Sequence, residues 1–125
     1  MKIILLMLIT SFLNLNTQKE IDLSDFKGKW HSEQMDNMVI YIYKAKDGYW
    51  YGKIVGSDKK SNIGKLMLKK LSPNKEQNKL TGKVRKPETG FEANVTLELK
   101  QSNQLKMTTH ILLMSRTFDL RKVKN

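Results

Sequence analysis

The chain of 125 residues contains no cysteine. Without thiols it forms no disulfide, no thiolate zinc site, no cysteine nucleophile and no dithiol redox motif. A bacterial lipoprotein anchor, which is attached to cysteine, is excluded for the same reason. We therefore expect a domain that is held together by its hydrophobic core alone, which is feasible at this length.

Long hydrophobic runs are also missing, apart from a short one at Ile3–Ile9 that follows Lys2. It is too short to span a bilayer as a helix, which takes about 20 apolar residues. A positive charge followed by a short apolar stretch is typical of a secretory signal peptide. We predict a signal peptide over residues 1–18, cleaved after Thr17 or Gln18, and a single β-barrel domain over residues 19–125. The mature protein is then exported, periplasmic or extracellular, and has no transmembrane segment.

Acidic residues are few: 12 Asp and Glu stand against 23 Lys and Arg, which gives a net charge of +11. A basic excess of this size makes nucleic acid a candidate partner. The basic residues are scattered, however, and most of them are lysine. Together with export, this predicts no nucleic-acid partner and leaves an anionic envelope surface as a candidate partner.

No sustained helical periodicity follows the apolar run. Instead, short β-type segments recur at the 8–12-residue spacing of an antiparallel meander. The sixth segment alternates most regularly, with Phe91, Ala93 and Val95 on one face and Glu92 and Asn94 on the other. The predicted strands are Gly28–Ser32, Met38–Ala45, Tyr49–Gly56, Ile63–Leu71, Lys79–Lys86, Phe91–Leu99, Gln104–Leu112 and Ser115–Val123.

About eight such strands with one apolar face close most naturally into an all-β, antiparallel up-and-down barrel, because closure removes the exposed edges. An open sandwich is the alternative. The second and third strands flank Asp47-Gly48, the strongest short-range hairpin signal.

The turn length at this hairpin stays open. A two-residue loop places Tyr41 and Tyr43 on the face that carries Trp50 and Ile54. A three-residue loop, Lys46–Gly48, places isoleucines there instead. Both registers keep Trp50 and Ile54 on one face.

Four segments resemble the secreted bacterial domain-of-unknown-function family 2147: Gly28-Lys29-Trp30, Ile40–Lys44, Asp47–Val55 and Ser115–Val123. The resemblance covers Phe26–Val123. It implies a small barrel similar to lipocalins or fatty-acid-binding proteins, an envelope location and no established activity. Trp30 and Arg116 resemble the lipocalin pair in which an arginine of the last strand covers a tryptophan at the closed end of the barrel. We expect them to form a structural plug, with a cation–π contact.

Residues for catalysis or metal binding are sparse. The two histidines, His31 and His110, lie far apart in the sequence, and the carboxylates fall on wet strand faces or in turns. We therefore predict no enzyme activity, no metal site and no cofactor. Met107 and Met114 are interpreted as gap-filling core side chains.

The leading functional hypothesis is a non-enzymatic binding module for a small apolar or amphipathic ligand, whose cavity is lined by Trp50, Tyr41, Tyr43 and Ile54. The alternative is a fully packed structural or interaction barrel that uses its basic surface on anionic envelope partners. Cavity volume is the property that separates the two.

Overall fold

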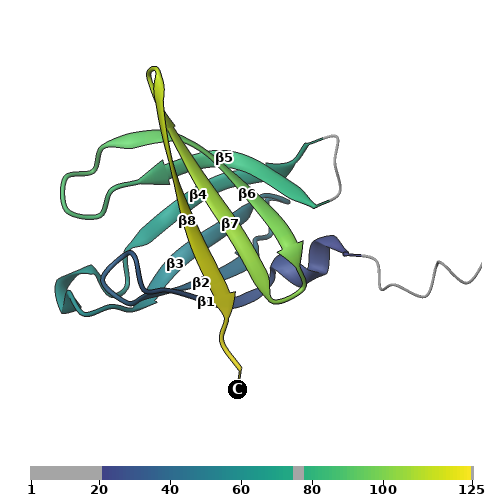
Figure 1. Ribbon diagram of the computed structural model, residues 1–125, viewed down its shortest axis with the longest axis horizontal. Coiled ribbons are helices and arrows are strands. Elements are labelled where there is room, and N and C mark those ends of the chain that lie inside the picture. The colour runs from purple at the N-terminus through teal and green to yellow at the C-terminus, as the bar shows by residue number, and fades with distance from the viewer. Residues whose placement is uncertain (1–20, 75–77, 125) are drawn as a thin grey trace, which may run out of the picture.

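The strands of the protein form one closed antiparallel barrel in the order β1 to β8, so each strand pairs with its neighbours in the sequence and β8 pairs with β1. The computed structural model (Figure 1) describes residues 21–74 and 78–124, and the predicted signal peptide and its cleavage site lie outside them. The all-β barrel that the sequence predicts is confirmed. A short 3-10 helix, η2 (Leu23–Phe26), precedes the first strand.

The strands follow the predicted segments closely. They are β1 (Gly28–Ser32), β2 (Met38–Lys44), β3 (Trp50–Gly56), β4 (Leu66–Pro73), β5 (Lys79–Arg85), β6 (Glu92–Gln101), β7 (Gln104–Ile111) and β8 (Met114–Lys122). The largest difference is the start of β4, which was predicted at Ile63. A second 3-10 helix, η3 (Lys60–Asn62), and the turn after it occupy that segment. In this turn the Ile63 and Lys65 amides donate back to the carbonyls of Lys60 and Asn62.

The β2–β3 hairpin adopts the three-residue loop. The Ala45 amide donates to the Tyr49 carbonyl (2.8 Å) and the Gly48 amide donates to the Ala45 carbonyl (3.0 Å). Gly48 has a φ of +89°, a conformation that glycine adopts without steric cost. The register therefore pairs Ile42 with Gly52 and Tyr43 with Tyr51.

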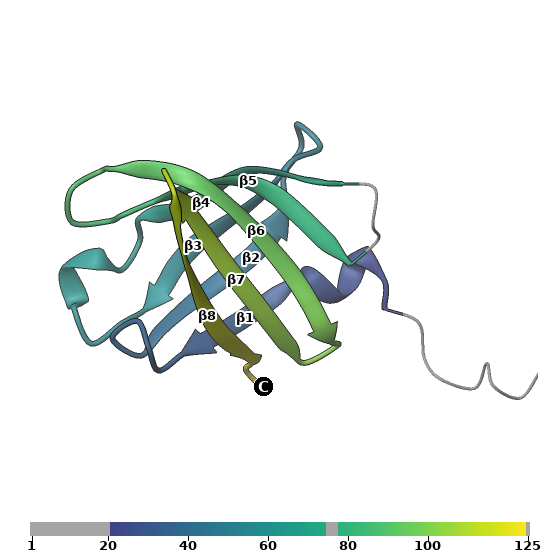
Figure 2. The ribbon, with the colours of Figure 1, turned by 45° about the horizontal axis from the view of Figure 1, so that its top comes forward.

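The two ends of the barrel differ in the elements that form them. Figures 1 and 2 show η2 at one end, together with the β2–β3 and β6–β7 turns, the end of β4 and the start of β5; we call this the closed end. The β1–β2, β3–β4 and β5–β6 loops and the β7–β8 hairpin lie at the other, which we call the open end. The hairpin projects beyond the other strands at the top of Figure 1.

Branched aliphatic side chains fill the middle of the barrel. One row across the strands runs Gly28–Ile42–Gly52–Leu68, and Leu68 leans over Gly52 so closely that a Cβ there would lie 2.7 Å from Leu68 Cδ1. The fully buried side chains from the middle of the barrel to the closed end include Ile40, Ile42, Ile54, Leu68, Leu71, Leu80, Leu97, Leu99 and Leu105. Branched side chains occupy the interior here, and the cavity that the structure shows lies nearer an end.

Candidate functional site

A cavity of about 340 Å³ lies at the open end of the barrel, between its loops and the inner faces of the strands. This volume is at the lower end of the range for small-molecule sites, about 300–1,000 Å³. Its apolar lining comes from six strands and two loops: Met35, Met38, Met67, Val84, Phe91, Ala93, Met107, Ile111 and Phe118.

Four methionines contribute to this lining: Met35, Met38, Met67 and Met107. Met38, Met67 and Met107 are buried, and Met35 packs against the core while partly exposed. Unbranched thioether side chains have several accessible rotamers and fill irregular spaces. The walls of this cavity can therefore adapt to an occupant more readily than the branched side chains in the middle of the barrel.

The rim of the cavity carries three cationic side chains, Lys59, Lys86 and Arg116. Lys59 is neutralised, since its Nζ lies 3.6 Å from Asp36 Oδ2 and 3.4 Å from Glu88 Oε2. Arg116 and Lys86 have no carboxylate within ion-pair distance in the described part of the chain. The Arg116 guanidinium lies 5.2 Å from the centroid of the Phe118 ring, over the apolar lining. An anionic group at the mouth of the cavity would meet these two uncompensated charges.

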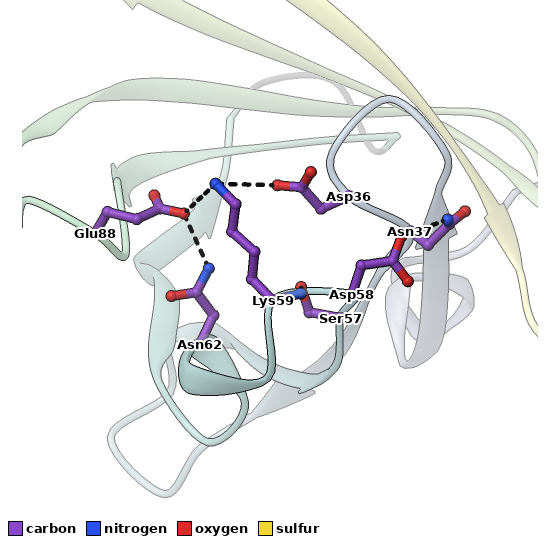
Figure 3. A network of polar contacts seen from close by, with 7 residues as sticks. All are labelled: Asp36, Asn37, Ser57, Asp58, Lys59, Asn62 and Glu88. Carbon is purple, nitrogen blue, oxygen red and sulfur yellow. Dashed lines mark hydrogen bonds and ion pairs between the residues drawn. The ribbon is translucent and has the colours of Figure 1, made fainter.

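Figure 3 shows how polar contacts connect three loops of the open end around Lys59. Besides the two ion pairs of Lys59, Asn62 Nδ2 donates to Glu88 Oε2 (3.0 Å), and Asn37 Nδ2 donates to Asp58 Oδ2 (2.8 Å). The hydrogen bond from Asn62, reinforced by Lys59, holds the pKa of Glu88 below its usual value of 4.5. The contact with Glu88 is also the main reason that the pKa of Lys59 is raised. Both groups therefore remain charged at neutral pH, and the network fixes one side of the cavity mouth.

A buried hydroxyl lies next to the cavity. Ser32 is 1% exposed, faces the interior, and stands opposite the cavity-lining Met38 in the β1–β2 pair. Its Oγ has no hydrogen-bond partner among the described residues. Buried polar atoms are nearly always satisfied, and Ser32 is not itself among the residues that line the cavity.

Of the residues predicted to line a cavity, none lies in this one. Trp50 and Ile54 do face the interior, but they lie in the packed region, where Trp50 meets Phe26 edge to face at 6.3 Å. Tyr41 and Tyr43 lie on the outer wall, where Tyr43 stacks between Tyr41 (5.5 Å) and Tyr51 (6.1 Å). The three-residue loop explains this correction, because it turns the tyrosines outward and the isoleucines inward.

The predicted plug of Trp30 and Arg116 is also corrected. Trp30 is fully buried at the closed end, and its Nε1 donates to the Phe26 carbonyl (2.9 Å). The cation over its ring is Lys122, with Nζ 4.9 Å from the centroid. Lys122 Nζ also donates to the Asp25 carbonyl (2.7 Å), and burial lowers the pKa of Lys122. Arg116 is on the inner side of β8, as strand parity predicts, but at the open end.

The two histidines, His31 and His110, are not in contact with each other. His31 Nε2 contacts Asn37 Oδ1 (3.2 Å) and His110 Nε2 contacts Thr96 Oγ1 (3.3 Å). Over residues 21–74 and 78–124, no three His, Cys, Asp or Glu side chains gather in a way that would hold a metal ion.

The methionine lining is the feature that sequence reasoning missed. Met107 is a buried core residue as interpreted, but Met114 is 70% exposed at the β7–β8 tip, which corrects its assignment to the core. Met67 in β4 is far in the sequence from Met35 and Met38, which lie in the β1–β2 loop and at the start of β2, and only barrel closure brings them to one end. No local pattern signals such a gathering.

Comparisons with known protein families and with curated proteins identify no relative of this chain. A scan against models of protein families finds none that matches the chain, and a search of curated proteins finds no match either. Within the described residues, the helices are too short and too polar to cross a membrane. The resemblance to the secreted family therefore stays a prediction.

Proposed function

We propose that the protein is an exported, non-enzymatic binding module that holds one small amphipathic molecule with an anionic head at the open end of its barrel. The observation that carries the proposal is the methionine-lined cavity with Arg116 and Lys86 at its rim. An apolar tail would lie against Met38, Met67 and Met107, and the head would meet the cations. Flexible thioether walls suit tails of different shape.

The chemistry of the rim favours binding over catalysis. A carboxyl group that acts as a general acid at neutral pH needs a raised pKa, usually from an apolar environment. At this rim the pKa of Glu88 is lowered instead, by Asn62 and Lys59. Lys59, in turn, is bound by two carboxylates. These groups are arranged to remain charged and to hold loops together.

Calorimetric titration with decanoate and with decanol tests the proposal, because the two probes share a tail and differ in the charge of the head. We expect decanoate to bind more tightly than decanol. Arg116→Gln should weaken decanoate by about tenfold, since a hydrogen bond to a charged group contributes about 1.5–3 kcal/mol when formed and the rim is partly solvated. The affinity for decanol should not change.

Two further variants test where the binding site lies. Ala93→Phe puts a ring into the cavity and should abolish binding of both probes, with folding checked by its urea midpoint. Tyr43→Ala, on the outer wall, should leave both affinities unchanged. If Ala93→Phe binds decanoate as the wild type does while folded, or if Tyr43→Ala loses it, the proposed site is wrong.

A further inference from the structure

The tip of the β7–β8 hairpin consists of four consecutive apolar residues that are exposed to solvent. Leu112 and Leu113 are 99% and 102% exposed, Met114 is 70% exposed and Ile111 is 38% exposed. Scattered exposed apolar side chains are normal on a protein surface and need no explanation. An unbroken run at the apex of a projecting hairpin is different, because nothing in the described structure covers it.

The turn itself is unfavourable for these residues. Ile111 pairs with Met114, so Leu112 and Leu113 form a two-residue loop, and Leu112 has a φ of +51°. Glycine or asparagine is preferred at such a position, and a bulky side chain there is an outlier. The sequence therefore places leucines at the one spot where a polar turn residue would serve the fold better.

Other apolar side chains are exposed at the same end of the barrel. Ile63, in the β3–β4 loop, is 45% exposed, and Phe91, before β6, is 53% exposed. Both lie in loops that border the open end, as the hairpin tip does (Figure 1). The open end thus carries apolar groups on three separate connections, of which the hairpin rises above the other strands in Figure 1.

Shape and charge point to a lipid surface as the occupant. A stable protein–protein interface buries about 800 Å² on each partner, whereas the tip is a narrow convex apex formed by a two-residue turn. No hydrogen-bonding side chain lies between Ile111 and Met114, which suits an acyl-chain environment. Arg116 follows two residues after Met114, and the chain as a whole has a net charge of +11. Basic side chains next to an apolar segment favour anionic headgroups.

We propose that the β7–β8 hairpin inserts Leu112, Leu113 and Met114 into the surface of an anionic bilayer, with Arg116 at the headgroup level. Leu112, Leu113 and Met114 do not line the cavity, whereas Arg116 belongs to its rim as well. Insertion would place the mouth of the cavity next to the bilayer, although docking does not require the cavity to be occupied.

Sedimentation with vesicles tests the proposal on the full chain. Phosphatidylcholine vesicles that contain phosphatidylglycerol should retain the protein, and pure phosphatidylcholine vesicles should retain it at least tenfold less. The variant Leu112→Asn/Leu113→Gly should lose at least tenfold in partitioning to the anionic vesicles while it folds as well as the wild type, because Asn-Gly favours a tight hairpin turn. The control Tyr49→Thr removes an exposed apolar side chain at the closed end and should bind normally.

The absence of cysteine allows a direct measurement of insertion. A nitrobenzoxadiazole dye on Leu113→Cys should shift to the blue on anionic vesicles, and the same dye on Tyr49→Cys should not. The proposal is overturned if the wild type does not partition to anionic vesicles or if the Asn-Gly variant binds them like the wild type. It is also overturned if the emission of the dye at position 113 stays the same on anionic vesicles as in water. Docking and ligand binding are distinguishable, because the Asn-Gly variant should retain decanoate and Ala93→Phe should retain vesicle binding.

Discussion

Replacing Ile42 by alanine tests the register of the β2–β3 hairpin and the packing of the barrel together. Ile42 is fully buried, and its cross-strand neighbours on both sides, Gly28 and Gly52, have no side chain. Leu68 already leans over Gly52, so it has little room to move further. The space that Ile42 leaves would stay largely empty. We therefore expect a loss of about 3–4 kcal/mol, in the upper part of the range of about 2–5 kcal/mol for such truncations.

Urea unfolding followed by the fluorescence of the two buried tryptophans measures this loss. With a slope of about 2 kcal/mol per molar urea, the midpoint should fall by about 1.5–2 M. The matched control is Tyr43→Ala, the next residue on the outer wall. It removes aromatic contacts with Tyr41 and Tyr51 that contribute about 0.5–1.5 kcal/mol each and should shift the midpoint less. If Tyr43→Ala is as destabilising as Ile42→Ala, the tyrosines face inward and the three-residue loop is refuted.

Three further changes test other parts of the barrel. Gly82→Ala would bring a Cβ to 2.7 Å from the Lys70 carbonyl oxygen, a backbone atom that cannot rotate away, and should cost about 1–3 kcal/mol in urea unfolding; an unchanged midpoint would contradict this close approach. The lowered pKa of Glu88 means that its contacts stabilise the protein above pH 4.5, so the difference in Tm between the wild type and Glu88→Gln should vanish as the pH falls below that value. Burial lowers the pKa of Lys122, so stability should rise with pH in the alkaline range where the amine loses its proton. Lys122→Met should lack that rise in pH-dependent urea titrations.

The fold could be predicted from the sequence because the alternation of apolar and polar residues marks the individual strands. Alternation from Ala93 to Leu99 reports which face of β6 is buried, and the structure buries Val95, Leu97 and Leu99 on that face. Phe91 shares this parity but is 53% exposed, because it precedes the first residue of β6. Parity indicates the side of a strand on which a residue lies. It does not indicate how far along the barrel that residue lies.

The same distinction explains the misplaced plug. Arg116 and Lys122 are both on the inner side of β8, and only the register with β1 decides which of them covers Trp30. That register pairs Trp30 with Lys122. Arg116 precedes Lys122 by six positions along the strand and therefore lies at the opposite end of the barrel. For Tyr41 and Tyr43 the error came from a one-residue difference in loop length, which moves every side chain of a strand to the other face.

The distribution of side-chain types along the barrel gives a physical reason for proposing a ligand site at the open end. In the middle, branched residues such as Ile40, Ile54 and Leu71 have few rotamers and define one packed arrangement. At the closed end, Trp30 and η2 complete this packing through the hydrogen bond to the Phe26 carbonyl. All five methionines of the described chain lie at the open end, four in the cavity lining and one at the hairpin tip. A barrel selected for stability alone has no reason to sort flexible thioethers from branched side chains in this way, because methionine specifies a core poorly. Sorting of this kind is expected where one end must remain rigid while the other accommodates apolar groups that are not part of the chain.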